Sequence, residues 1–321
     1  MTRLVEQDAI RDAARALRGI AIDTPLLPAH WLGEEIGAEV RLKCENLQRA
    51  GAFKIRGAYT MISRLPEETR RNGVITYSSG NHAQAVALAA GIFGIPAVVV
   101  MPTTAPRVKV EGAKRLGAEV VFEGTTSAER HRRALDIASQ RGLAMVPPFD
   151  HPDIIAGQGT AGLEITRDWP DVDAVLVPIG GGGLASGIAA WVKRERPRCL
   201  VIGVEPEVSC AMRRSIDAGQ PVTIEPQPSI ADGLLPVRPG DLTFAHAHAL
   251  LDDIVTVPED AIADATARLL TRSRLIVEPS GAATVAALLA GRFQPRGRRT
   301  AAVLSGGNLD PGRIPELLAR V

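Results

Sequence analysis

The sequence has few aromatic residues and few cysteines. Phe, Trp and Tyr make up 3% of the 321 residues, and the formal net charge is only +1. No basic run is interleaved with aromatic residues, so we do not expect a nucleic-acid partner. The three cysteines, Cys44, Cys199 and Cys210, have neither a CxxC nor a metal-like spacing. This usage is typical of a reducing compartment, and we expect a cytoplasmic protein.

Long uninterrupted apolar runs are also missing. The most apolar stretch, 85–101, contains Gly91, Gly94 and Pro96 and falls just short of the length that crosses a bilayer. A buried helix followed by a buried strand explains it better. The first 19 residues are charged and predict an amphipathic helix rather than a signal sequence. We therefore expect no membrane association.

Lysine is scarce as well. Of the 37 basic residues only five are lysines, so the chain uses arginine wherever it needs only positive charge. An amine can lose its proton, act as a nucleophile and form an imine, whereas a guanidinium stays protonated. Lys54, between Phe53 and Ile55 in "GAFKIRGAY", is therefore a candidate for chemistry. The alternative is a solvated surface charge, which is what a single lysine usually is.

Short apolar runs followed by helical patterns recur along the chain. Continuous apolar strands between helices predict parallel sheets that are covered on both faces, and hence an α/β fold of two doubly wound layers. The first layer has strands at 74–78, 97–101, 119–123 and 143–147, and the second at 174–180, 200–206, 252–257 and 300–306. Helices are expected between them, among them 127–141 with a Thr126-x-x-Glu129 capping box and 258–273. The proline-containing stretch 220–245 predicts a long ordered loop, and the first 60 residues could pack with either layer.

Four successive glycines follow the strand in "VPIGGGGLASG", residues 177–187. Backbone N–H groups without neighbouring Cβ atoms can converge on an anion at a helix N-terminus, and phosphate is the usual ligand. A tight turn is the simpler alternative, although one or two glycines would suffice for it. A dinucleotide site also stays open, because Gly180-x-Gly182-x-x-Ala185 with Glu205 fits the degenerate fingerprint.

Other common catalytic motifs are absent from the sequence. There is no GxxxxGK[ST], no GxSxG and no HExxH. His246-x-His248 lies in an alanine-rich helical stretch and is interpreted as structural.

A second polar cluster, "SSGNHAQ" at 78–84, lies where a strand meets a helix. Ser78, Asn81 and the first N–H groups of that helix suit a carboxylate. Ordinary N-capping is the alternative, but one cap would account for only one of these residues. A third cluster, 305–308, also follows a strand. Because ligands of parallel sheets bind at the carboxyl ends of strands, we expect these clusters to share one site.

These segments together resemble fold type II (β-family) pyridoxal-phosphate enzymes, in particular the threonine/serine dehydratase (ammonia-lyase) and serine racemase group. The matching motifs run in order along the chain: "KCENLQRAGAFKIRGAY", "SSGNHAQA", "MPTTAPRVK", "IAGQGTAGLEI", "VPIGGGGLASGI", "IADG", "VEPSGA" and "LSGGN". The resemblance implies a tryptophan-synthase-β-like fold with pyridoxal 5'-phosphate in the cleft between two domains. It implies a large domain of 1–63 and 151–321, a small domain of 73–150 and a hinge at 64–72.

The resemblance also implies a role for each matching residue. Lys54 would hold the cofactor as an imine, Phe53 would pack on its ring, Asn81 would bind the ring hydroxyl and Ser305 would face the ring nitrogen. The phosphate would be held by Gly180, Gly181, Gly182, Gly183 and the N–H of Leu184. The substrate would be bound by Ser78, Ser79, Asn81 and His82, with Gly233 in the pocket-lining loop 229–240. Ser79 matches the serine that acts opposite the lysine in racemases of this group.

The implied reaction is β-elimination of a β-hydroxy L-amino acid, such as threonine or serine, to a 2-oxo acid and ammonia. Serine racemase, 3-hydroxyaspartate ammonia-lyase, a nucleotide-dependent oxidoreductase and a non-catalytic amino-acid-binding protein stay open as alternatives. The group implies a homodimer or higher homo-oligomer. Metal-stimulated relatives carry an Asp six residues after the position of Glu205, where this chain has Ala211, so no strong metal site is expected. Glu205 and the Ser209 carbonyl could still hold a weakly bound cation.

Overall fold

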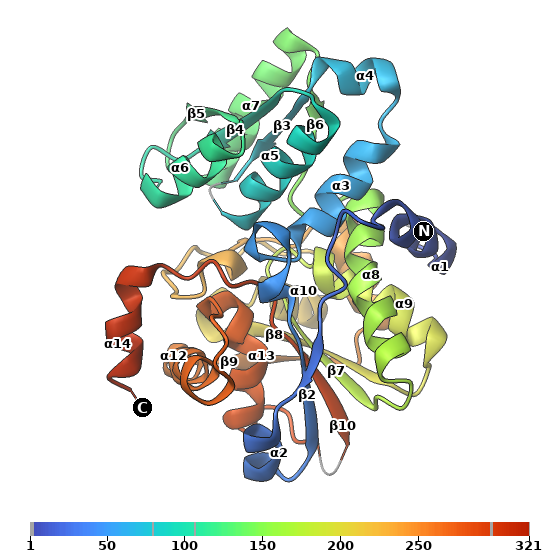
Figure 1. Ribbon diagram of the computed structural model, residues 1–321, viewed down its shortest axis with the longest axis vertical. Coiled ribbons are helices and arrows are strands. Elements are labelled where there is room, and N and C mark those ends of the chain that lie inside the picture. The colour runs from blue at the N-terminus through green and yellow to red at the C-terminus, as the bar shows by residue number, and fades with distance from the viewer. Residues whose placement is uncertain (1–2, 79, 106, 296–297, 321) are drawn as a thin grey trace.

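A computed structural model describes residues 3–78, 80–105, 107–295 and 298–320. The chain forms two sheets, which Figure 1 shows one above the other, with the four-stranded sheet at the top. The larger sheet has the strand order β1-β2-β10-β7-β8-β9, and the smaller has the order β5-β4-β3-β6. All strand pairs are parallel except β1 with β2.

The strands are short and mostly apolar. Their bounds are β1 Leu26–Pro28, β2 Glu39–Lys43, β3 Val74–Tyr77, β4 Ala97–Met101, β5 Glu119–Phe122, β6 Ala144–Met145, β7 Ala174–Pro178, β8 Leu200–Pro206, β9 Asp253–Val257 and β10 Arg299–Val303. The helices are α1 Gln7–Ala16, α2 His30–Ile36, α3 Lys54–Arg64, α4 Glu67–Asn72, α5 Asn81–Phe93, α6 Arg107–Arg115, α7 Ser127–Arg141, α8 Pro152–Asp168, α9 Gly183–Glu195, α10 Ala211–Ala218, α11 Asp241–Leu250, α12 Glu259–Arg268, α13 Pro279–Leu289 and α14 Ile314–Leu318.

Helices cover both faces of each sheet. In the larger layer, α1, α8 and α9 share one core cluster with the inner strands, while α2, α12 and α13 pack on the opposite face. In the smaller layer, α5 and α6 pack on one side of β3 and β4, and α7 packs on the other. Strands buried on both faces need apolar residues at every position, which is why β4 and β7 are buried along their whole length.

Helix α3 connects the two layers, since it packs against both α5 and α8. Close approach to α8 requires a glycine, because a Cβ on Gly57 would lie 2.5 Å from the amide nitrogen of Gln158. Arg56 fixes the same helix through buried ion pairs. Its guanidinium donates to Glu45 (Nε to Oε2, 2.8 Å) and to Glu164 (Nη1 to Oε1, 2.5 Å), and the ammonium of Lys43 donates to the other Glu164 oxygen at 2.5 Å.

The structure confirms the predicted alternation of strands and helices and corrects several details. Helix α11 begins at Asp241, inside the stretch 220–245 that was expected to be a loop. The helix expected over 258–273 ends as an α-helix at Arg268, and a π-helical turn, Leu269–Ser273, follows. The first 60 residues supply β1 and β2 to the larger sheet. The domain boundaries at 63, 73 and 150 stay predictions.

Across the described residues, no helix has the length and apolar character needed to cross a bilayer.

Candidate functional site

Lys54 is the first residue of α3, and the start of this helix docks on the segment after β10. The N–H of Phe53 donates to the carbonyl of Ser305 at 3.2 Å, and Ala52 forms a β-bridge with Gly306. The carbonyl of Gly306 in turn accepts the N–H of Glu278 at 3.0 Å. We call the meeting place of residues 51–54, 78–82, 278 and 305–308 the junction. It brings together segments that are far apart in the sequence.

The surroundings of Lys54 are not those of a surface lysine. Its Nζ donates to the carbonyl of Pro148 at 2.8 Å and lies 5.0 Å from the ring centroid of Phe53. Burial of the amine lowers the pKa of Lys54 to about 8, and the negative charge of Glu278 opposes that shift. A substantial fraction of this amine is therefore neutral near neutral pH. The interpretation of Lys54 as a solvated surface charge is wrong.

The glycine run follows β7 and leads into α9. Gly182 has φ +94°, a conformation that side chains disfavour, and no side chain caps α9. Close packing also requires these glycines, because a Cβ on Gly181 would lie 2.1 Å from the ring of Phe149, and one on Gly183 would lie 3.1 Å from the Cβ of Phe149. The N–H groups at the start of α9 are thus without a side-chain partner, as an anion site requires.

Gly233 lies against the same run. A Cβ on Gly180 would lie 2.8 Å from the Gly233 carbonyl oxygen, while the Gly233 N–H donates to Ser280 Oγ at 2.8 Å. Gly233 belongs to a short 3₁₀ turn, Asp232–Leu234, whose Asp232 forms an ion pair with Lys109 of α6. The loop 229–240 therefore contacts both the glycine run and the smaller layer. Leu184 is buried in the first turn of α9.

Helix α5 begins beside the end of β3. The N–H of Gly80 donates to Ser78 Oγ at 3.3 Å, and α5 has no side-chain cap. Ordinary N-capping of α5 by Ser78 or Asn81 is thus not observed. The predicted residue Ser79 lies outside the described residues. The uncapped start of α5 gives the junction a second group of N–H donors, next to Asn81 and His82.

The imidazole of His82 is buried and faces away from solvent. Its Nε2 lies 3.0 Å from the carbonyl of Val146, which can only accept, so Nε2 carries the proton. Nδ1 has no hydrogen-bond partner within the described part of the chain. Burial and the charge of Lys54 lower the pKa of His82 to about 3, so the ring is neutral. Only the backbone of His82 is suited to hold an anion.

Glu278 and Asn308 are junction residues to which the sequence motifs "VEPSGA" and "LSGGN" gave no role. Asn81 Nδ2 donates to Glu278 Oε1 at 2.6 Å, and Asn81 Oδ1 accepts from Asn308 Nδ2 at 2.8 Å. Burial, assisted by the charge of Asp232, raises the pKa of Glu278 to about 7. A buried carboxyl beside a buried amine marks a functional site more often than a structural one.

These groups fit the chemical features of pyridoxal phosphate. The uncapped α9 offers N–H donors to a phosphate, the half-buried Lys54 amine can react with an aldehyde, and Ser305 is buried close to both. The Ser305 hydroxyl makes no hydrogen bond to another described residue, so it is free for a ring nitrogen. The tight glycine packing leaves no side chain in the way of the phosphate.

Two other predicted residues have structural partners. His246 accepts the N–H of Val5 at Nε2 (2.8 Å) and contacts the Leu242 carbonyl through Nδ1 (2.8 Å), which confirms its structural interpretation. Glu205 accepts the backbone N–H groups of Met212 and Arg213 at 2.9 and 2.8 Å. Both of its oxygens are therefore used to hold the start of α10.

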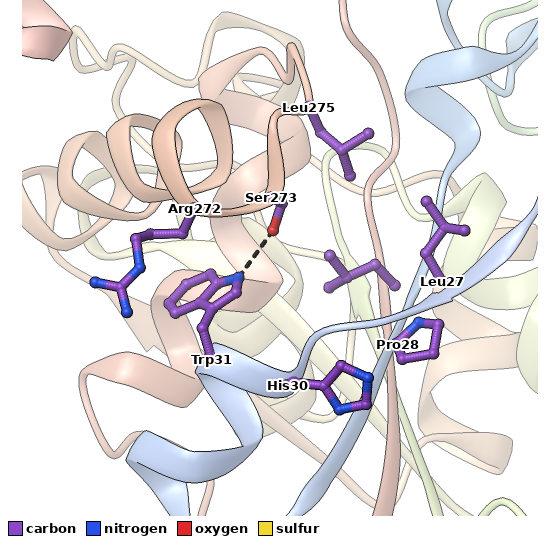
Figure 2. Close-up of a pocket in the computed structure, with 8 residues that line it drawn as sticks. Leu27, Pro28, His30, Trp31, Arg272, Ser273 and Leu275 are labelled. Atoms are coloured by element: carbon purple, nitrogen blue, oxygen red, sulfur yellow. Dashed lines mark hydrogen bonds between the residues drawn. The ribbon is translucent and has the colours of Figure 1, made fainter.

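Two surface cavities lie apart from the junction. One, of about 300 Å³, lies between β1, α2 and the π-helical turn, and Figure 2 shows the Trp31 indole N–H that donates to Ser273 Oγ at its edge, at 2.9 Å. The other, of about 430 Å³, lies between α1 and α8. No predicted site residue lines either cavity.

Comparison with known proteins agrees with this geometry. The family model described as pyridoxal-phosphate dependent enzyme matches residues 17–306. An L-threonine ammonia-lyase of Thermotoga maritima is 44% identical over 98% of this chain and 78% of the relative. An L-threo-3-hydroxyaspartate ammonia-lyase of a Pseudomonas species is 41% identical over 95% of this chain and 96% of the relative. The structure of maize serine racemase superposes with a TM-score of 0.95 at 35% identity, over 99% of this chain and 98% of the maize chain.

These similarities replace the dinucleotide interpretation of residues 174–205, and the two parallel sheets are those of the tryptophan-synthase-β-like fold. The chain belongs to the pyridoxal-phosphate dependent enzymes, as a threonine ammonia-lyase-like member of the group that contains ammonia-lyases and racemases.

Proposed function

We propose that the enzyme eliminates the β-hydroxyl of an L-amino acid such as threonine or serine and releases a 2-oxo acid and ammonia. The observation that carries this proposal is the Lys54 amine, which is held beside Phe53 and Ser305 with a pKa of about 8. Such an amine can both react with a carbonyl and accept a proton near neutral pH. The Thermotoga maritima relative, an L-threonine ammonia-lyase, supports the choice of reaction.

In this proposal the two uncapped helix starts hold the anionic groups. The N–H groups from Gly180 to Leu184 bind the cofactor phosphate, and those at the start of α5, with Ser78, Asn81 and His82, bind the substrate carboxylate. Gly233 brings the loop 229–240 against the glycine run, where it lines the substrate pocket. The two anions would thereby fix the α-carbon next to Lys54.

Lys54 then removes the α-proton. Pyridoxal phosphate, when bound, supplies the electron sink for the negative charge left at the α-carbon. Ser305 is a neutral partner for the ring nitrogen and does not force it to stay protonated, so the sink is weak. Loss of the β-hydroxyl relieves the charge at once, which favours elimination over transamination. The predicted Ser79 would act on the opposite face of the substrate.

Racemisation and elimination of 3-hydroxyaspartate are the alternatives within the same group. They are favoured by the similarity to maize serine racemase and to the Pseudomonas 3-hydroxyaspartate ammonia-lyase. Both use the same cofactor site and differ in what happens after the α-proton is removed or in the side chain accepted. Association into a homodimer is a separate prediction, which sedimentation analysis of the purified enzyme would check.

Borohydride reduction followed by peptide mass analysis tests the cofactor linkage. We expect a pyridoxyl adduct on the peptide that contains Lys54, and loss of the adduct and of turnover in Lys54→Ala with the fold retained. An unmodified Lys54 in enzyme that binds the cofactor would overturn the role of this residue.

A panel of L-threonine, L-serine and L-threo-3-hydroxyaspartate, assayed for 2-oxo acid and for D-isomers, tests the reaction. We expect 2-oxo acid and ammonia in equal amounts from threonine or serine. D-amino acid as the main product would replace the lyase with a racemase, and preference for 3-hydroxyaspartate would replace the substrate.

A further inference from the structure

A chain of hydrogen bonds crosses the junction and ends at Glu278. Asn308 Nδ2 donates both to the carbonyl of Ala50 at 2.9 Å and to Asn81 Oδ1 at 2.8 Å, and Asn81 Nδ2 donates to Glu278 Oε1 at 2.6 Å. The four groups come from three widely separated parts of the sequence. They connect the backbone next to Lys54 with the start of α5 and the start of α13.

The direction of every bond in this chain follows from the Ala50 carbonyl. A carbonyl only accepts, so the nitrogen of Asn308 has to face it. The same nitrogen then faces Asn81, whose nearer atom has to be its oxygen. The nitrogen of Asn81 is therefore turned toward Glu278, and one of its two N–H bonds is used there. The second N–H of Asn81 is left for a ligand.

Two glycines make room for this chain. A Cβ on Gly51 would lie 2.2 Å from Asn308 Oδ1, and a Cβ on Gly306 would lie 2.3 Å from Glu278 Oε1. Contacts this short do not occur, so a side chain at either position would displace one of the two polar residues. Both glycines belong to motifs that also contain Lys54 or Ser305. Their absence of a side chain thus serves the orientation of Asn81.

We propose that Asn308 and Glu278 are positioning residues, which together hold the Asn81 amide in the one orientation that presents its remaining N–H to the ring hydroxyl of pyridoxal phosphate. Reversal of the amide would present the carbonyl oxygen to that hydroxyl's oxygen and weaken binding. The proposal depends on the cofactor and is independent of the substrate and of the type of reaction.

Asn308→Asp tests the proposal because it changes the direction of the chain with almost no change in volume. An Asp at 308 only accepts at the positions facing Ala50 and Asn81, so the Asn81 amide would turn over. Apoprotein is titrated with pyridoxal phosphate, and the Kd, the visible absorption maximum and the emission of the bound cofactor are recorded. We expect the Kd to rise about tenfold or more, as for the loss of one buried hydrogen bond, and the absorption maximum to shift.

Variants of Glu278 separate orientation from charge. Glu278→Gln keeps an oxygen that accepts from Asn81, so we expect a Kd within about threefold of the wild-type value and an unchanged absorption maximum. Glu278→Ala removes the acceptor and should resemble Asn308→Asp. Rescue by Gln relative to Ala is not expected of a residue whose only role is to fill space.

Asn46→Asp is the matched control. Asn46 lies in the same region and donates to the Ile276 carbonyl at 3.1 Å, outside the chain. It places a carboxylate in a similarly buried position, and we expect it to lower thermal stability without moving the absorption maximum. An Asn308→Asp protein with wild-type Kd and absorption would overturn the proposal, as would the same spectral change in Asn46→Asp. Neither result would bear on the proposed elimination, which is measured separately with substrate.

Discussion

Lys54 differs from an ordinary lysine mainly in its protonation. Burial lowers its pKa from the usual 10.5 to about 8 in the protein without cofactor. Between about pH 8 and 10.5 the folded apoprotein has released this proton while the unfolded chain still binds it. The free energy of unfolding of the apoprotein should therefore rise with pH across this window.

Denaturant titrations of apoprotein at several pH values between 8 and 10.5 would measure this effect. Lys54→Met removes the titrating group and keeps the length of the side chain, so the rise should be smaller in this variant. Equal pH dependence in the two proteins would contradict the lowered pKa of Lys54.

Gly181 is the glycine of the run with the least space. Because a Cβ would lie 2.1 Å from the Phe149 ring, we expect Gly181→Ala to cost about 1–3 kcal/mol of stability and to weaken cofactor binding. Gly112→Ala is the control, since its Cβ would meet Gln84 at an ordinary 3.5 Å within helix α6. That variant should be neutral or slightly stabilising. Chemical denaturation of both variants checks the difference.

At the scale of elements, α3 is held by the buried ion network around Arg56. Arg56 is 1% exposed and is shared by Glu45 of the short 3₁₀ turn Glu45–Leu47 and by Glu164 of α8. Arg56→Ala would leave two buried carboxylates without their main partner, so we expect a loss of about 3–5 kcal/mol. Arg213→Ala breaks exposed ion pairs with Asp217 and Asp253 and should cost less than about 1 kcal/mol. Similar losses in the two variants would show that burial is not the cause.

Local signals made some elements predictable and long-range contacts decided the others. Helix α7 was expected at 127–141 and has these bounds, because its capping box and closing glycine act within a few residues. Strands β1 and β2 were not expected, since β2 is defined by pairing with β10, which lies more than 250 residues later. The start of α11 at Asp241 was missed because prolines before it suggested a longer loop.

The same distinction applies to the site. Lys54, the glycine run and the turn at 78–82 are recognisable because each carries its chemistry in one short motif. The partnership of Glu278 with Asn81 and Asn308 has no local signal, since the three residues come from separate parts of the chain. The neutral state of His82 depends on burial, which a motif does not reveal.

At the scale of the whole molecule, the ion pair between Lys109 and Asp232 connects the two layers directly. Both side chains are partly exposed, so the pair should contribute no more than about 1 kcal/mol and should weaken with salt. We expect KM to rise modestly with ionic strength in the wild-type enzyme. Lys109→Met should start with a higher KM that depends less on salt. Steady-state assays between low and high salt would check this, and an equal salt dependence in both enzymes would contradict it.

The central place of β10 has a consequence for biosynthesis. This strand lies between β2 and β7 and is among the last segments to leave the ribosome. Until it arrives, two inner strands expose unpaired backbone groups and apolar surface, which favours aggregation. Nascent chains that end before Arg299 should therefore depend on chaperones, and the larger layer should close only after synthesis is nearly complete.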